Sequence, residues 1–192
     1  MLELIVGVVS AIVLFLIVVG VIFTYNFLVS LRARVDNAWS QIDVQLKRRV
    51  DLIPNLIETV KGYAKFEKSV LVQVTNARTS MMSATSAKEK ADANNMLTGA
   101  LKSLFAVAEA YPALKANENF ISLQEELSST ENKIAYARQF YNDSVMSWNT
   151  AILQFPTNLI AGIVGMSKQK DYFGVSEAER AVVKADFSDL SK

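Results

Sequence analysis

The fold is decided by residues 28–81, which read LVSLRARVDNAWSQIDVQLKRRVDLIPNLIETVKGYAKFEKSVLVQVTNARTSM. Apolar side chains recur there at alternating steps of four and three residues, the heptad spacing of a helix buried along one stripe. The stripe comprises Val35, Trp39, Ile42, Leu46, Arg49, Ile53, Leu56, Val60, Tyr63, Glu67, Val70, Val74, Ala77 and Met81. Only Arg49 and Glu67 are charged. The stretch therefore predicts a bundle of long helices.

The composition supports the same class of fold. The 192 residues include 7 Gly and 3 Pro, and about half of the chain is hydrophobic. So few turn-forming residues favour long helices over sheets, and the apolar content is enough for a core. We predict an all-α fold, in which an N-terminal transmembrane helix is followed by a long up-and-down bundle of the four-helix type.

The transmembrane helix is predicted from residues 4–23, which are uncharged and rich in Ile, Val and Leu. Twenty helical residues extend about 30 Å, the thickness of a hydrocarbon core. A cleaved signal peptide would have a shorter apolar region and a basic start, whereas this start carries Glu3. We therefore expect residues 1–25 to be a retained anchor with the lipid bilayer as its partner. Gly7 and Ala11 form a small-xxx-small pair that would let two anchors touch.

The charges that flank the anchor predict its orientation. Arg32 and Arg34 follow it, and Lys47, Arg48 and Arg49 come next, while no basic side chain precedes it. By the positive-inside rule, the bundle should lie in the cytoplasm and the N-terminus outside. A periplasmic bundle is the less favoured alternative.

The bundle is expected over residues 26–166, with loops at 83–95 and 113–119, and Pro156 ending the last long helix. Asn117 or Asn119 should cap that helix. Pro54 allows two interpretations. The unbroken heptad favours one kinked helix, whereas matched segments at 30–50, 55–82, 88–111 and 117–155 favour a break there. Residues 167–192 are polar and are expected to form a mobile tail.

Charged residues on or beside the apolar stripes form one candidate site. We expect them to form interior ion pairs that fix the register of the helices, because an unpaired interior charge is costly. The alternative is that they line a groove for a ligand or partner. The set comprises Arg49, Glu67, Arg78, Glu131 and Arg138.

Apolar residues after Pro156 form a second candidate site. They follow the last long helix and are too few to span a bilayer. An apolar patch of this kind marks an interface between proteins or a contact with a membrane, and we favour a homo-oligomer. Its members are Leu159, Ile160, Ile163 and Val164.

The sequence offers no recognisable chemistry. It contains no Cys and no His, which excludes most catalytic triads and the commonest metal ligands. No Gly-rich phosphate loop occurs. The net charge of +1 and the lack of aromatic residues among basic ones give no sign of nucleic-acid binding. We predict no catalytic, cofactor-binding or metal-binding residues, and no enzyme.

Several motifs together resemble the LemA family of bacterial membrane-anchored helical proteins. They are Tyr25-Asn-Phe-Leu-Val29, Asn37-Ala-Trp-Ser40, Gln45-Leu-Lys-Arg-Arg49, Asp51-Leu-Ile-Pro-Asn-Leu56, Val60-Lys-Gly-Tyr-Ala64, Ala77-Arg78, Glu109-Ala-Tyr-Pro-Ala-Leu-Lys-Ala-Asn117, Phe120, Leu123-Gln124, Glu131, Ala137-Arg138, Tyr141-Asn142, Asn149, Phe155-Pro156 and Tyr172-Phe173. The resemblance implies one pass through the inner membrane, an external N-terminus and a helical bundle, and slightly favours a break at Pro54. It implies no established enzymatic activity.

Two classes of function remain. The first is a scaffold or interaction protein that self-assembles at the membrane. The second is an accessory or regulator of a membrane zinc metalloprotease in envelope quality control. Both follow from the resemblance, because relatives include proteins of magnetosome membranes and family members often occur beside such a protease.

Overall fold

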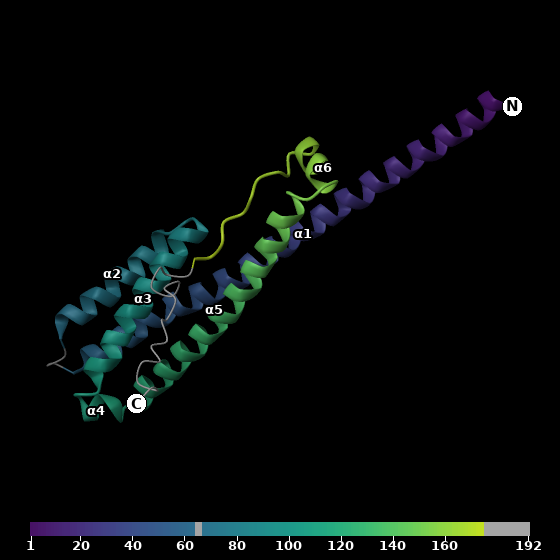
Figure 1. Cartoon of the computed structure of the whole chain (residues 1–192). Coiled ribbons are helices and arrows are strands. Elements are labelled where there is room, and N and C mark those ends of the chain that lie inside the picture. The colour runs from purple at the N-terminus through teal and green to yellow at the C-terminus, as the bar shows by residue number, and fades with distance from the viewer. Residues whose placement is uncertain (64–66, 175–192) are drawn as a thin grey trace, which may run out of the picture. The chain divides into compact units, whose positions relative to one another are not determined.

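The computed structural model describes residues 1–63 and 67–174, and their regular structure is helical (Figure 1). The helices are α1 (Leu2–Lys61), α2 (Lys68–Ser83), α3 (Ala87–Ala108), α4 (Pro112–Lys115), α5 (Glu118–Ala151) and α6 (Thr157–Ile163). The predicted all-α class is therefore confirmed.

The chain forms two compact units. The first contains residues 1–46 and 130–172, and the second contains residues 47–129 together with Phe173 and Gly174. Helices α1 and α5 each contribute to both units. The bundle that we expected as one domain over residues 26–166 is thus divided, and the anchor belongs to the same unit as the start of the bundle.

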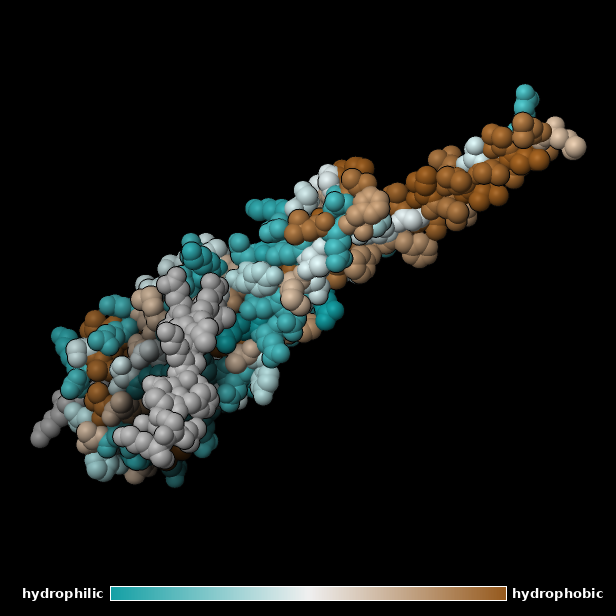
Figure 2. Space-filling view, in the orientation of Figure 1, coloured by the Kyte–Doolittle hydropathy of each residue, from teal (hydrophilic) through white to brown (hydrophobic). Residues whose placement is uncertain are grey.

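The first part of α1 has the properties of a membrane anchor. Among the described residues, α1 is the one helix long and apolar enough to cross a membrane, and no protein covers that stretch. Leu14 is 63% exposed and Phe15 66% exposed. Figure 2 shows this part as a continuous hydrophobic rod. Side chains so apolar and so exposed fit a helix that is surrounded by lipid, because burial of apolar surface is favourable.

Within the first unit, α1 and α5 bury their apolar stripes. The rings of Trp39 and Tyr141 pack with their centroids 5.4 Å apart and their planes tilted by 55°. The buried residues are Leu28, Val35, Ala38, Ile42 and Leu46 of α1, and Ile134, Tyr141, Val145, Trp148 and Ala151 of α5, together with Ile152 and Ala161. Val35, Ile42 and Leu46 belong to the predicted heptad, whereas Ala38 is buried at the step where Trp39 was predicted and Trp39 is half-buried.

The core of the second unit is built by the end of α1, by α2, α3 and α4, and by the start of α5. Phe105 and Phe120 meet edge to face, with ring centroids 5.9 Å apart. The central side chains are Ile53, Leu56, Val60, Val74, Ala77, Leu97, Leu101, Leu104, Leu114 and Leu127. Each fully buried aliphatic side chain of this kind contributes about 1.5–3 kcal/mol to stability.

Helix α1 passes through Pro54 without a break and ends at Lys61. Of the two interpretations of Pro54, the continuous helix is therefore confirmed, and the break between segments 30–50 and 55–82 is not observed. The turn lies instead at Gly62 and Tyr63, eight residues further on. The Tyr63 hydroxyl donates to the Ala113 carbonyl at 3.1 Å. The Tyr63 side chain therefore belongs to the connection that follows α1 and not to the buried stripe of that helix.

The start of α3 also differs from the prediction. The loop expected over residues 83–95 is limited to a few residues, because α3 begins at Ala87 with a capping box. Ser86 Oγ accepts from the Glu89 amide at 3.1 Å, and the Glu89 carboxylate accepts from the Ser86 amide at 3.1 Å and the Thr85 amide at 2.9 Å. These bonds to Thr85 and Ser86 lower the pKa of Glu89 from 4.5 to about 2. A strong cap thus overrides the polar composition that suggested a loop.

At the start of α5, the prediction of an asparagine cap is confirmed. Asn117 Oδ1 accepts from the Phe120 amide at 3.1 Å. Asn117 rather than Asn119 is therefore the capping residue.

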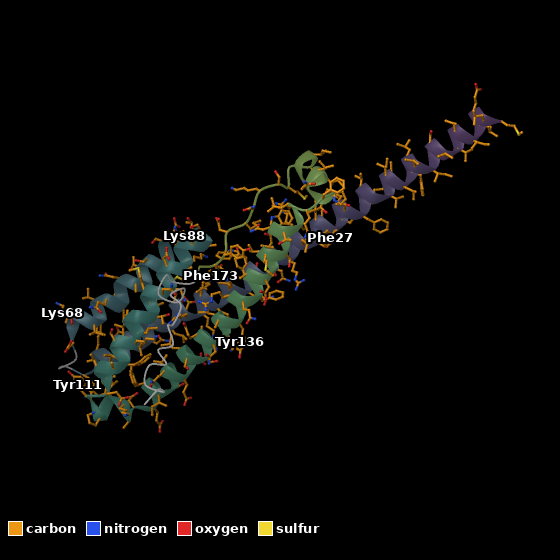
Figure 3. The ribbon with its side chains drawn as sticks, viewed as in Figure 1. Phe27, Lys68, Lys88, Tyr111, Tyr136 and Phe173 are labelled. Carbon is orange, nitrogen blue, oxygen red and sulfur yellow. The ribbon has the colours of Figure 1, made fainter. Side chains whose placement is uncertain are left out.

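The segment after α6 is not a free tail. Tyr141, Trp148 and Asn149 of α5 bind the backbone of residues 168–171, which we call the strap. Phe173 is 2% exposed in the second unit (Figure 3). The expectation of a mobile tail from residue 167 is therefore wrong for residues 167–173. Its remainder, residues 175–192, lies outside the described part of the chain.

Candidate functional site

Arg49 is buried in the second unit and is 3% exposed. Its Nη1 donates to Asn94 Oδ1 at 2.7 Å and to Thr98 Oγ1 at 3.0 Å, both on α3. Thr98 Oγ1 in turn donates to the Asn94 carbonyl at 3.0 Å. Neutral oxygen atoms thus solvate this cation within the core. A carboxylate partner for Arg49 remains a prediction.

Arg78 lies half-buried on α2 and reaches the backbone of α1. Its Nε donates to the Val50 carbonyl at 3.2 Å. That carbonyl is four residues before Pro54, which has no N–H to offer it. Arg78 therefore replaces the backbone hydrogen bond that Pro54 removes, and this explains how α1 continues through a proline.

The other three charged candidates are more peripheral. Glu67 is exposed and directly precedes α2. Its placement in the interior was wrong, because α1 ends before it and the heptad stripe does not continue through it. Glu131 and Arg138 are half-buried in the first unit, each with a polar or charged partner. The five charged candidates therefore divide between the two units, with Arg49, Glu67 and Arg78 in the second.

In the anchor, Gly7 and Ala11 both face outward from α1. A side chain added at Gly7 would meet nothing within 4 Å. This face is therefore open to lipid or to another helix.

The predicted apolar patch lies on and after α6 in the first unit (Figure 2). Ile163 is 85% exposed, Leu159 58% and Val164 38%, whereas Ile160 is half-buried. The fold of the described residues thus leaves most of the patch uncovered.

A hollow that we call the groove lies between α1 and α5 in the first unit. Its volume is about 580 Å³, and it is lined by Ser40, Gln41, Val44, Gln45, Lys133, Tyr136, Ala137 and Phe140. Val44 is 62% exposed and Tyr136, labelled in Figure 3, is 75% exposed. The guanidinium of Arg34 lies over the ring of Phe140, 5.4 Å from the ring centroid. Four of the lining residues are apolar or aromatic and four are polar, among them the cation Lys133.

Gln45 gives the groove an unusual feature. Its Oε1 atom is buried and has no hydrogen-bond partner within the described structure. Buried polar atoms are nearly always hydrogen-bonded, since an unpaired one costs roughly 1–3 kcal/mol. Gln45 Oε1 is therefore an unsatisfied acceptor beneath the surface of the groove.

The strap carries several backbone bonds to α5 in the first unit. Asn149 clamps Lys170, because its Nδ2 donates to the Lys170 carbonyl at 3.0 Å and its Oδ1 accepts from the Lys170 amide at 2.8 Å. The Tyr141 hydroxyl donates to the Asp171 carbonyl at 2.9 Å. Burial raises the pKa of Tyr141, and the nearby carboxylates of Asp171 and Asp36 add to the effect. Tyr141 therefore stays protonated and acts as a donor at physiological pH.

The sequence analysis missed the groove, the strap and the partners of Arg49. Asn94 was assigned to a loop, although Asn94 and Thr98 are one helical turn apart and in phase with buried Leu97 and Leu101. That spacing could have revealed them. No pattern in the sequence marks the groove, because exposed Val44 and Tyr136 look like ordinary surface residues.

Carboxylates do not gather in this fold. Over residues 1–63 and 67–174, no three Asp or Glu side chains lie close enough together to hold a metal ion.

Comparison with known proteins agrees with the architecture. The model of the LemA family matches residues 38–187. Protein LemA of Metamycoplasma hominis is 30% identical over 185 residues, which are 92% of this chain and 82% of that protein. Magnetosome protein MamQ 2 of Paramagnetospirillum magneticum is 25% identical, and magnetosome protein MamQ of Magnetospirillum gryphiswaldense is 23% identical. Each of these two matches covers 78% of this chain and 64% of the magnetosome protein. The chain belongs to the LemA family.

Proposed function

We propose that this protein is a non-enzymatic scaffold, anchored in the bacterial inner membrane, that self-assembles and recruits partners. The groove is the observation that supports it most directly. It combines three exposed apolar side chains, those of Val44, Tyr136 and Phe140, with a buried acceptor that lacks a donor, Gln45 Oε1. Exposed aromatic and aliphatic side chains that gather in a hollow are typical of the core of a protein–protein interface.

Two further surfaces fit self-assembly. The outward face at Gly7 and Ala11 would let anchors approach closely within the bilayer. The exposed side chains of Leu159 and Ile163 would then extend the contact beyond the span. Confinement to one membrane favours all such contacts, because anchored copies meet at a high local concentration.

The mass of the full chain in mild detergent at micromolar concentration tests self-assembly. We expect an oligomer, and we expect Val44→Asp to weaken it about tenfold or more, because a charge in an apolar contact is left unpaired. The paired substitutions Leu159→Asp and Ile163→Asp test the α6 patch in the same way. Val72→Asp is the matched control, because Val72 is 47% exposed on α2 in the other unit. A wild-type monomer would reject self-assembly.

The alternative function is that of an accessory or regulator of a membrane zinc metalloprotease. Co-purification from native membranes separates the two functions. If the chain co-purifies only with other copies of itself, the result supports the scaffold. If a protease is recovered in stoichiometric amount with the wild-type chain but not with the Val44→Asp variant, the result supports the alternative.

A further inference from the structure

A small cavity lies in the first unit, where the strap passes beside α1. Its volume is about 200 Å³, whereas a single ordered water needs only about 10–15 Å³. We call it the basic cavity, and its walls are formed by Arg32, Trp148, Gly165, Met166, Lys168 and Lys170. Three of these six residues are cations, so the cavity suits an anion.

One carboxylate partly balances these charges. Asp36 Oδ1 accepts from Lys170 Nζ at 3.3 Å, and its Oδ2 lies 3.9 Å from Arg32 Nε. The side chains of Arg32 and Lys170 remain 56% and 37% exposed. Asp36 therefore pairs with Lys170 and lies close to Arg32, and these three side chains together keep an excess of positive charge.

The remaining walls are fixed and poor in free donors. Trp148 Nε1 donates to the Lys168 carbonyl at 3.1 Å, and the Met166 amide donates to the Ala161 carbonyl at 2.8 Å. The asparagine clamp on Lys170 holds the adjoining backbone. The cavity is thus preorganised, and the side chains of Arg32, Lys168 and Lys170 are what it offers to a ligand.

The position of Arg32 along α1 indicates where the cavity stands relative to a membrane. No charged side chain occurs from Leu4 to Leu31, and 28 helical residues extend about 42 Å. Arg32 comes nine positions after Phe23, where the predicted span ends, so it lies about 14 Å beyond the hydrocarbon core and its long side chain extends back toward the headgroup layer. Long side chains on a helix lean toward its N-terminus, which here is the membrane side.

We propose that the basic cavity binds the phosphate of an anionic phospholipid headgroup. Arg32, Lys168 and Lys170 form charge-assisted hydrogen bonds with the phosphate oxygens, and half-buried Met166 contacts the apolar part of the lipid. Exposed Phe155 and Ile163, at 79% and 85%, provide more apolar surface at this end of the unit. The inference rests on the proposed membrane anchoring but not on self-assembly. The lipid would fix the tilt of the bundle on the membrane.

The test measures binding of short-chain phosphatidylglycerol to the full chain in a non-ionic detergent, by calorimetry and by native mass spectrometry. Short-chain phosphatidylcholine and inorganic phosphate are the comparison ligands. We expect phosphatidylglycerol to bind one-to-one and the other two to bind at least tenfold more weakly. Lys168→Gln and Arg32→Gln should each lower its affinity about fivefold, since one basic group near anionic lipid contributes about that factor.

Lys102→Gln is the control, because it removes one positive charge from an exposed position on α3 that lines neither the basic cavity nor the groove. Equal losses in all three variants would reduce the effect to general charge attraction and overturn the proposal. Phosphate that binds as tightly as the lipid would show a soluble anion as the ligand and overturn it too. Oligomer mass, measured in the same samples, reports separately on self-assembly.

Discussion

The hydrogen bond from Arg78 to the Val50 carbonyl explains how one side chain can keep a helix continuous through a proline. A proline inside a helix costs about 3 kcal/mol, partly because one carbonyl loses its partner. Arg78 Nε supplies that partner at the Val50 carbonyl. We expect Arg78→Met to lower the free energy of unfolding by about 1–3 kcal/mol, the cost of leaving a buried acceptor unpaired.

A double-mutant cycle isolates this role. In a Pro54→Ala background, residue 54 regains an N–H that bonds to Val50 by itself. There, Arg78→Met should cost about 1 kcal/mol or less, and chemical denaturation measures both values. An equal loss in the two backgrounds would show that Arg78 acts through packing alone.

The environment of Arg49 gives a second prediction at this scale. The short bond to Asn94 Oδ1 solvates a buried cation, and a hydrogen bond to a charged group contributes about 1.5–3 kcal/mol. Asn94→Ala should lower the free energy of unfolding by roughly that amount. Asn95→Ala, one position along α3 and half-buried, is the control and should change stability far less. Similar losses at both positions would contradict the role of Asn94.

The capping box of α3 predicts a pH dependence. The pKa of Glu89 is about 2 in the folded protein, whereas the ordinary value of this carboxyl group is 4.5. Because the folded pKa is lowered, Glu89 contributes stability above pH 4.5, and this contribution is lost as pH falls toward 2. Glu89→Gln should therefore be less stable than wild type at pH 7, with the difference shrinking between pH 4.5 and 2. Asp92→Asn, exposed on the same helix, is the control in urea unfolding at pH 7 and pH 3.

Among the elements, the strap depends most on a few side chains. Asn149 makes both hydrogen bonds to the backbone of Lys170, and Tyr141 holds the next residue. Asn149→Ala should release Lys170 while α5 itself stays helical. Hydrogen exchange is the measurement, and the Lys170 amide should exchange at least tenfold faster. Asn158→Ala, exposed on α6, is the control; unchanged exchange at Lys170 in the Asn149 variant would show that other contacts hold the strap.

The same elements show what the sequence could predict. The heptad spacing identified the buried stripe of α1 from Val35 to Val60, and the anchor was evident from its composition. Asn117 as a cap followed from local chemistry. These features depend on side chains close together in the chain, where periodicity and capping preferences apply.

Features that depend on distant contacts were not predictable in this way. Pro54 suggested a break because its compensating donor, Arg78, lies on another helix. Residues 167–173 suggested a free tail because their partners, Tyr141 and Asn149, look like ordinary polar residues of α5. Glu67 was placed in the interior because the heptad phase continues past Lys61, although Gly62 and Tyr63 end the helix.

At the scale of the whole molecule, the charges that flank the span predict its orientation in the membrane. The first basic residues after the span are Arg32 and Arg34, and the apolar part of α1 is preceded only by Glu3 and the N-terminus. Basic side chains close to a span are retained on the cytoplasmic side. The two units should therefore lie in the cytoplasm, with the N-terminus outside.

Because the chain contains no Cys, single cysteine substitutions report on topology without background. We expect Glu3→Cys to react with a membrane-impermeant maleimide in intact spheroplasts. Lys102→Cys, exposed on α3, should react only after the membrane is opened. Equal labelling of both variants in denaturant is the control for reactivity. Labelling of position 102 in intact spheroplasts would place the bundle outside, and the basic cavity would then face the lipids of the outer leaflet.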